Sequence, residues 1–169
     1  LSILLSWLSI KIAPKIGLMD IPGSAEHKSH LNPIPLTGGI VLMDLMIIMI
    51  LITGLWKDPK ILGVLVSGIV ISVFGILDDF LNLSPLKKFT GQILASIFLI
   101  YFGIQVNFFS SPEFFLRTNT FIDESFNYML TILWITTLTN AFNFIDSSDG
   151  LAVGLSGLSA AFFIFIFGF

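Results

Sequence analysis

Long apolar runs recur along the chain, and they limit its fold more strictly than any other feature of the sequence. Each run holds about 17–20 residues, close to the ~20 that an α-helix needs to cross a ~30 Å hydrocarbon core. Backbone groups in lipid must pair within their own segment, so runs of this length are predicted to be helices. The alternating ~10-residue strands of a membrane barrel are absent from the pattern. The sequence therefore predicts an all-α, polytopic transmembrane helix bundle with about six membrane segments, the first and last truncated.

The composition indicates the same class of protein. Hydrophobic residues make up 55% of the chain and charged residues 11%, whereas about a quarter of a soluble domain is charged. We therefore predict an integral membrane protein. The net charge of −3 argues against a nucleic-acid partner. The lack of cysteine excludes disulfides, thiol nucleophiles and cysteine metal sites.

Both ends of the chain lie inside apolar runs, with Leu1 at the start and Phe169 at the end. We therefore interpret residues 1–169 as a single integral membrane domain that is incomplete at both ends. If each run crosses the membrane once, the polar segments alternate between its two sides. One side receives the segments near 19–36, 78–88 and 140–150, and the other receives those near 56–60 and 107–124.

The basic residues assign these two sides. Cytoplasmic loops of membrane proteins carry an excess of Lys and Arg. The first side holds Lys11, Lys15, Lys28, Lys87 and Lys88, and the second holds Lys57, Lys60 and Arg117. This bias predicts that the segments near 19–36, 78–88 and 140–150 are cytoplasmic and that the other two are extracytoplasmic.

Two adjacent carboxylates, Asp78 and Asp79, close the predicted span that precedes the loop 80–88. The helix macrodipole disfavours negative charge at a C-terminus by roughly 0.3–1 kcal/mol for each exposed group. A cation is expected to offset this charge, either Lys87 or Lys88 across the short loop or a bound divalent metal. Consecutive helical residues point ~100° apart, so the two carboxylates are expected to serve different partners. The plain alternative is a solvated acidic boundary.

Two amides and two carboxylates occur at three-residue steps where a later span ends. They are Asn140, Asn143, Asp146 and Asp149. Each step turns ~60° on an ideal α-helix, so the four side chains converge only if the helix tightens or breaks near Ser147. Ser, Asp and Gly offer the backbone such non-helical options. Asp149 has an alternative role as the N-cap of a helix that starts at Leu151.

The acidic residues and lysines on the predicted cytoplasmic side suit a phosphate-bearing substrate. Mg²⁺ prefers oxygen ligands and commonly binds through one or two carboxylates together with substrate phosphates. A metal-assisted reaction at the membrane surface is therefore the chemistry that these residue types indicate.

Three ordered blocks of sequence give the chain a family resemblance. The first block reads Asp20-x-Pro22, Lys28-x-His30, Pro33-x-Pro35 and Gly38-Gly39. The second reads Gly75-Ile-Leu-Asp78-Asp79, followed by Lys88-x-x-x-Gln92. The third reads Asn140-x-x-Asn143-x-x-Asp146-x-x-Asp149-Gly150-Leu-Ala152. Over almost its whole length, the chain resembles the N-terminal and central part of the polyprenyl-phosphate N-acetylhexosamine-1-phosphate transferases, glycosyltransferase family 4.

The resemblance implies a multi-pass enzyme of the bacterial plasma membrane with its active site on the cytoplasmic side. Such an enzyme transfers a sugar 1-phosphate, here of the N-acetylglucosamine type, from a UDP-sugar to polyprenyl (undecaprenyl) phosphate and releases UMP. The lipid-diphosphate sugar would serve cell-wall or surface polysaccharide synthesis. Mg²⁺ is the implied cofactor, with Mn²⁺ as the alternative.

The resemblance also implies roles for individual residues. Asp78 and Asp79 look like the family's catalytic acidic pair, assigned to metal binding or to deprotonating the lipid phosphate. The implied substrate-binding residues are Lys28, His30, Lys88, Asn140, Asn143, Asp146 and Asp149. Within this set, Lys28 and His30 match a basic loop near the substrate phosphates, and the last three match the nucleotide-sugar residues.

The chain departs from the family pattern at Ser147, which stands where the family usually has glycine. His27 likewise stands where the family's first block usually carries arginine. The family also places another metal-binding Asp and a His-rich loop further along, beyond Phe169. The 169-residue chain alone is therefore expected to be inactive.

Two other functions remain open from the sequence. One is a sibling activity, the phospho-N-acetylmuramoyl-pentapeptide transferase of peptidoglycan synthesis. The other belongs to a different class, an ion-coupled membrane transporter with Asp44, Asp78 and Asp146 along an ion path. The transferase is favoured because the acidic residues gather at helix ends and only Asp44 lies well inside a span. A homo-oligomer is compatible with each of these functions.

Overall fold

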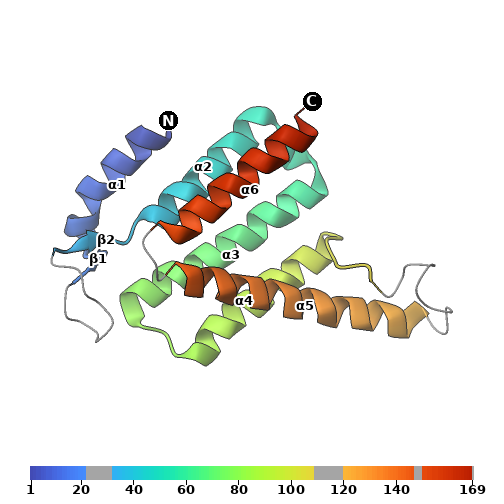
Figure 1. Cartoon of the computed structure of the whole chain (residues 1–169). Coiled ribbons are helices and arrows are strands. Elements are labelled where there is room, and N and C mark those ends of the chain that lie inside the picture. Colours follow the sequence, from blue (N-terminus) through green and yellow to red (C-terminus); the bar gives the residue numbers. More distant parts are fainter. Residues whose placement is uncertain (22–31, 109–119, 147–149, 169) are drawn as a thin grey trace. The chain divides into compact units, whose positions relative to one another are not determined.

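The computed structural model describes residues 1–21, 32–108, 120–146 and 150–168. These residues form two compact units, Leu1–Val106 and Asn107–Phe169, and each unit is described by itself. The elements of the first are α1 (Ser2–Ile16), β1 (Met19–Asp20), β2 (Ile34–Pro35), α2 (Gly38–Thr53), the 3₁₀ helix η1 (Leu55–Lys57), α3 (Pro59–Leu81) and α4 (Pro85–Tyr101). The second unit contains α5 (Thr120–Ile145) and α6 (Leu151–Phe167) (Figure 1).

The predicted all-α character is confirmed, with six α-helices in the described part of the chain. Two of them are long and apolar enough to cross a membrane, namely Pro59–Leu81 and Phe121–Ile145. The helices Gly38–Thr53 and Leu151–Phe167 are also apolar but shorter. By length and composition, two helices of the described chain could therefore cross a membrane.

Several helices extend further into the polar segments than predicted. The predicted loop 78–88 contracts to residues 82–84, because α3 continues through Leu81 and α4 begins at Pro85. The loop 107–124 was predicted too long, because α5 already begins at Thr120. Proline explains the α4 boundary: its fixed φ suits the first turn of a helix, where its missing N–H is not needed.

Helix α3 begins with a capping interaction that is visible in the sequence. Asp58 is the N-cap, and its Oδ1 accepts a hydrogen bond from the backbone N–H of Lys60 at 2.8 Å. Pro59 occupies the next position, and Gly54, in the left-handed conformation with φ 73°, ends the preceding α2. In the predicted turn near 56–60, a glycine thus ends one helix, one turn of 3₁₀ helix follows, and an Asp-Pro pair begins the next helix.

Replacing Asp58 by Ala is expected to destabilise the chain by about 0.5–2 kcal/mol, because an N-terminal N–H of α3 loses its acceptor. The measurement is the SDS-unfolding midpoint of the detergent-solubilised protein, followed by circular dichroism. Asp58→Asn keeps a capping oxygen and should unfold close to the wild type. Equal midpoints for the two variants would show that the cap contributes nothing.

A short antiparallel ribbon, β1 with β2, lies at the two ends of the segment near 19–36 that was expected to be a loop. Met19 pairs with Pro35 and Asp20 with Ile34, and the Leu36 N–H donates to the Leu18 carbonyl at 3.1 Å. Proline is tolerated because a two-stranded ribbon consists only of edge strands. In Figure 1 the ribbon and the α3–α4 turn lie at the same end of the first unit.

Helices α3 and α4 pack closely through two pairs of glycine and phenylalanine. A Cβ on Gly91 would meet the ring and Cβ of Phe74, and a Cβ on Gly63 would meet Phe102. Phe74 follows Gly63 by 11 residues, as Phe102 follows Gly91, which is about three helical turns and keeps both pairs on one face. In lipid the hydrophobic effect does not drive helices together, so they associate through close van der Waals packing, which small residues allow.

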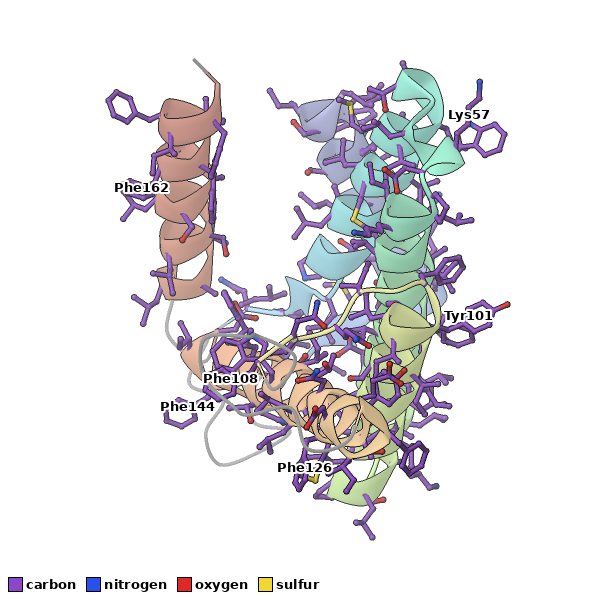
Figure 2. All side chains as sticks on the ribbon, turned by 90° about the vertical axis from the view of Figure 1, so that its right-hand side faces the viewer. Lys57, Tyr101, Phe108, Phe126, Phe144 and Phe162 are labelled. Atoms are coloured by element: carbon purple, nitrogen blue, oxygen red, sulfur yellow. The ribbon has the colours of Figure 1, made fainter. Side chains whose placement is uncertain are left out.

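Gly150-x-x-x-Gly154, at the start of α6, has the spacing of a helix-packing motif. In the described chain α6 has no buried residue, and a Cβ on Gly154 would meet nothing within 4 Å. Figure 2 shows side chains such as Phe162 projecting away from this helix. The small-residue faces that pack belong to α3 and α4, where Gly63, Ser67, Gly91 and Ala95 are buried.

Two lysines of the first unit lie beside exposed tryptophan rings. The Lys11 ammonium lies 3.5 Å from the centroid of the Trp7 ring, and that of Lys57 lies 5.9 Å from the centroid of Trp56. Figure 2 shows Lys57 and Tyr101 projecting outward, and Tyr101 is 80% exposed. Trp, Tyr and Lys with these exposures are typical of the interface between hydrocarbon and headgroups.

Candidate active site

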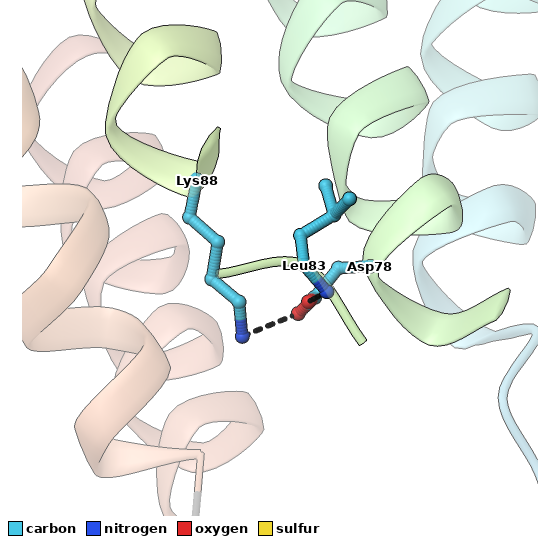
Figure 3. Close-up of polar contacts among 3 residues, drawn as sticks. All are labelled: Asp78, Leu83 and Lys88. Atoms are coloured by element: carbon cyan, nitrogen blue, oxygen red, sulfur yellow. Dashed lines mark hydrogen bonds and ion pairs between the residues drawn. The ribbon is translucent and has the colours of Figure 1, made fainter. Parts of the chain in front are cut away.

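The acidic pair lies in the last turn of α3, and its first member is held on both carboxylate oxygens. Oδ2 of Asp78 is 2.7 Å from the Lys88 ammonium, and Oδ1 accepts the Leu83 N–H at 2.9 Å (Figure 3). The α3 C-cap, Asn82, has a φ of 46°, and its N–H donates to the Asp78 carbonyl at 2.8 Å. Backbone and side chain of Asp78 together fix the turn 82–84.

The ion pair offsets two unfavourable helix-dipole interactions at once. Asp78 is a negative charge at the C-terminal end of α3, and Lys88 is a positive charge in the first turn of α4. Each charge alone is at the wrong end of its own helix. The prediction that a lysine across the loop compensates Asp78 is therefore confirmed, with Lys88 as that lysine.

Solvent limits how much this pair adds to stability. The Lys88 side chain is 48% exposed and that of Asp78 is 26% exposed. Pairs with such access to water typically contribute about 0.2–1 kcal/mol. The contact therefore matters more for the geometry of the turn than for the stability of the fold.

Asp79 has surroundings different from those of its neighbour. It is exposed, whereas Asp78 is partly buried. This difference follows from the ~100° rotation between consecutive helical residues. The expectation that the two carboxylates face different partners agrees with this geometry. Asp79 is the member of the pair that is presented to the surroundings.

The polar residues of the second unit lie at the C-terminal end of α5. Asn140 Nδ2 donates to the Thr136 carbonyl at 2.8 Å, so this amide binds back onto its own helix. Asn143 and Asp146 are exposed. The Asp146 N–H donates to the Phe142 carbonyl at 2.9 Å, an i to i−4 bond. The helix therefore stays α-helical up to Asp146 and does not tighten.

The predicted break in the helix is present directly after Asp146. Helix α5 ends at Ile145, and α6 starts at Leu151 with Gly150 as N-cap at φ 76°. Glycine takes this left-handed conformation without steric cost. Gly150 is the N-cap of α6, and Asp149, for which that role was the alternative, lies outside the described residues.

The structure thus gathers the predicted site residues in two groups. Asp78, Asp79 and Lys88 belong to the first unit, and Asn140, Asn143 and Asp146 belong to the second. Lys28, His30 and Asp149 lie outside the described residues. Asp44 is an exposed residue in the first half of α2.

Sequence reasoning missed Asn82 and the Leu83 N–H as parts of this turn. A signal was available, because asparagine is one of the few residues other than glycine that adopt the left-handed conformation at a helix end. Asn82 followed by Ser84-Pro85 marks both the stop of α3 and the start of α4.

The donor chemistry of this turn suits a hard cation. Among the described residues there is no cluster of three or more His, Cys, Asp or Glu that could hold a metal ion. Mg²⁺ does not require such a cluster, since it is often held by one or two carboxylates plus substrate phosphates. Asp79, which is exposed, and Asp78, whose oxygens accept from Lys88 and from the Leu83 N–H, are the two carboxylates of this turn.

Comparison with known proteins identifies a matching family and several similar proteins. The family model described as glycosyl transferase family 4 matches residues 61–169. The probable undecaprenyl-phosphate N-acetylglucosaminyl 1-phosphate transferase of Bacillus subtilis is 37% identical over 156 residues, which is 88% of this chain and 41% of the relative. The undecaprenyl-phosphate alpha-N-acetylglucosaminyl 1-phosphate transferase of Escherichia coli is 31% identical over 151 residues, 89% of this chain and 40% of the relative.

A third relative is the decaprenyl-phosphate N-acetylglucosaminephosphotransferase of Mycobacterium tuberculosis, with 31% identity over 157 residues. That match covers 88% of this chain and 38% of the relative. The chain thus spans roughly two-fifths of the length of these relatives. No solved structure matches it at a significant level.

Proposed function

Because the chain belongs to glycosyl transferase family 4, we propose that the complete protein transfers N-acetylglucosamine 1-phosphate from UDP-N-acetylglucosamine to a polyprenyl phosphate. UMP is the second product. The observation that carries the proposal is the match over 88% of the chain to a relative named for this transfer, the Bacillus subtilis protein. The relatives' names all specify N-acetylglucosamine and differ in the polyprenyl chain, undecaprenyl or decaprenyl.

The reaction is a phosphoryl transfer between two phosphate-bearing substrates. An oxygen of the lipid phosphate attacks the β-phosphorus of the UDP-sugar, and the bond from that phosphorus to the bridging oxygen of UMP breaks. The protein's part in such a reaction is mainly positioning and electrostatic stabilisation. Mg²⁺, when bound, neutralises charge on the diphosphate, and Asp79 is the described residue that we assign to hold it.

The remaining site residues divide by substrate. We assign Asn143, Asp146 and Asp149 to the nucleotide-sugar and Lys28 and His30 to the phosphates. The exposure of Asn143 and Asp146 at the end of α5 supports this role, because a soluble nucleotide-sugar reaches the site from water. Asn140 supports the helix end through its bond to Thr136.

The proposed location is the bacterial plasma membrane, with the site on the cytoplasmic face. The bacterial origin of the relatives and the excess of lysine beside the ribbon and the α3–α4 turn support it. UDP-sugars are soluble nucleotides, which is consistent with a site that opens to the cytoplasm.

The test uses the complete protein in proteoliposomes with UDP-N-acetylglucosamine, undecaprenyl phosphate and Mg²⁺. One UMP should be released for each lipid-linked sugar formed. Transfer from UDP-N-acetylmuramoyl-pentapeptide and not from UDP-N-acetylglucosamine would identify the peptidoglycan enzyme instead. Ion flux without any UMP release would favour the transporter.

Replacing Asp146 by Asn in the complete protein should raise the KM for UDP-N-acetylglucosamine by about tenfold, equal to about 1.4 kcal/mol of binding. Steady-state kinetics at saturating lipid give this value. Asp123→Asn is the matched control, because Asp123 lies in the first turn of the same helix, far from Asp146. Unchanged KM in the Asp146 variant would remove this residue from the nucleotide-sugar site.

A further inference from the structure

Helix α1 carries one tryptophan and two lysines at four-residue steps, Trp7, Lys11 and Lys15, which we call the α1 stripe. We propose that the α1 stripe binds the headgroup of an anionic phospholipid of the surrounding membrane. The inference rests on the membrane location proposed above and not on the proposed reaction, because no residue of the stripe belongs to the candidate active site.

The α1 stripe lies on the side of its helix that is turned away from the packing of the first unit. Ser9 accepts a hydrogen bond from the Thr37 hydroxyl at 3.0 Å, and Ala13 is fully buried. Lys11 follows Ser9 by two residues, a rotation of ~200°, and Trp7 precedes Ser9 by the same rotation. Each four-residue step adds only ~40°, so the three side chains of the stripe share the outward face. All three are exposed, Trp7 by 53%.

The contact between α1 and α2 gives the depth of the stripe. Thr37 is the N-cap of the apolar helix α2, so Ser9 lies level with the start of α2. The two helices run in opposite directions (Figure 1). At ~1.5 Å per residue, the backbone of Trp7 lies ~3 Å to the apolar side of that level, and that of Lys15 lies ~9 Å beyond it. Tryptophan followed outward by lysine is the usual order at the boundary between hydrocarbon and headgroups.

The ammonium of Lys11 is held close to this boundary. It lies 3.5 Å from the centroid of the Trp7 ring, where the face of the indole attracts a cation. The charge therefore stays at the depth of the tryptophan, whereas a solvated lysine would extend into water. A phosphate at that depth would meet a cation that is already in place.

The order of side chains along the outward face matches the order of groups in a phospholipid. Ile3 and Leu4, which are 85% and 55% exposed, precede the stripe and can contact acyl chains. The indole suits the glycerol and ester region, and the two lysines suit the phosphate. Helix α1 contains no acidic residue, so nothing on this helix neutralises the two positive charges.

An ordinary charged helix end does not account for the whole stripe. The helix macrodipole favours a lysine in the last turn, which explains Lys15. Lys11 lies a full turn earlier and beside an exposed tryptophan ring. The other lysine near a tryptophan, Lys57, is 5.9 Å from the centroid of its ring and is followed by the carboxylate of Asp58. The α1 stripe is therefore the better anion site of the two.

The experiment uses the complete protein in bilayers, with Trp7 as its only tryptophan because the others are replaced by phenylalanine. Quenching of Trp7 fluorescence is compared between brominated phosphatidylglycerol and brominated phosphatidylcholine. The anionic lipid should be preferred about 25-fold, because one lysine near an anionic surface contributes about fivefold. Lys11→Gln combined with Lys15→Gln should reduce the preference to near one.

Lys57→Gln combined with Lys60→Gln is the matched control. It removes the same number of charges at the other end of α2, beside the start of α3. It should keep the wild-type lipid preference at Trp7. Circular dichroism and the SDS-unfolding midpoint check that all variants are folded like the wild type.

Four outcomes would overturn the proposal. Two are equal quenching by both lipids in the wild type, and a preference that survives the loss of Lys11 and Lys15. Quenching by neither lipid would show that another part of the complete protein covers this face of α1. Preferential displacement of the brominated lipid by undecaprenyl phosphate would make the substrate lipid the occupant in place of a phospholipid.

The quenching measurement needs neither a UDP-sugar nor turnover, which separates this inference from the proposed function. A preference for phosphatidylglycerol in a protein that transfers no sugar phosphate would leave the lipid site standing and remove the proposed reaction. Sugar-phosphate transfer without any lipid preference at Trp7 would remove the lipid site alone.

Discussion

Asp79→Asn in the complete protein is expected to abolish nearly all Mg²⁺-dependent sugar-phosphate transfer, by ~10³-fold or more. The substitution keeps the shape of an exposed side chain in the last turn of α3 but removes its charge. Loss of an electrostatic group that acts on the transferred phosphate costs ~10²–10³-fold in other enzymes, and loss of a metal ligand adds to this. The measurement is the initial rate of UMP release in proteoliposomes at saturating substrates.

Asp58→Asn is the matched control for this prediction. Asp58 is also a carboxylate beside α3 but lies at the opposite end of that helix. Both variants should insert and purify like the wild type, so a loss confined to Asp79 reports on chemistry. Turnover of the Asp79 variant at the wild-type rate would contradict both the assignment of this residue and the proposed reaction.

Gly91→Ala is expected to lower the free energy of unfolding of the first unit by about 1–3 kcal/mol. The new Cβ would lie 2.8 Å from the Phe74 Cβ and 2.7 Å from its Cδ1, contacts too short to keep. These atoms are close to the backbone of α3, so the helices must separate, and overpacking of this kind costs about 1–3 kcal/mol. The usual gain in helix propensity of about 1 kcal/mol offsets only part of this cost.

Gly75→Ala is the control for this second prediction, because a Cβ at Gly75 meets nothing within 4 Å. It should stabilise the chain slightly. Phe74→Ala combined with Gly91→Ala should be less destabilised than the sum of the two single effects, since the ring is the main obstacle. SDS-unfolding midpoints of the detergent-solubilised chain are measured for the wild type, Gly91→Ala, Gly75→Ala, Phe74→Ala and the double variant. Equal midpoints for Gly91→Ala and Gly75→Ala would show that α3 and α4 do not pack closely.

The helices were predictable from the sequence because a long apolar run in lipid must pair its own backbone groups, as an α-helix does. The residues at which the helices begin and end were less predictable. Lys88 and Pro85 read as loop residues by polarity, yet proline at the first position and the Ser84 N-cap start α4 earlier. In the same way α5 extends back to Thr120, past aromatic and acidic residues that were read as an interfacial loop.

The sequence predicted which residue types form the candidate site, but only part of the contacts that they make. Charge reasoning identified a lysine as the partner of the acidic pair, and the structure selects Lys88. The two bonds of Asp78 and the α3–α4 glycines were not predictable, because they depend on the register between two helices. Small residues at four-residue spacing, as on α6, likewise show where a helix can pack and not whether a partner is there.

The α3–α4 hairpin has a consequence for how the protein moves. Its two Gly–Phe pairs lie about three turns apart, and the turn is tied by Asp78. A slide of one helix by a single turn, ~5.4 Å, would unseat both rings and break the Lys88 contact together. Packed interfaces shift between discrete states and do not deform continuously. We therefore expect α3 and α4 to move together as one rigid body during turnover. Bending of the chain would then fall outside the hairpin, at the turns that contain Gly54 and Gly103.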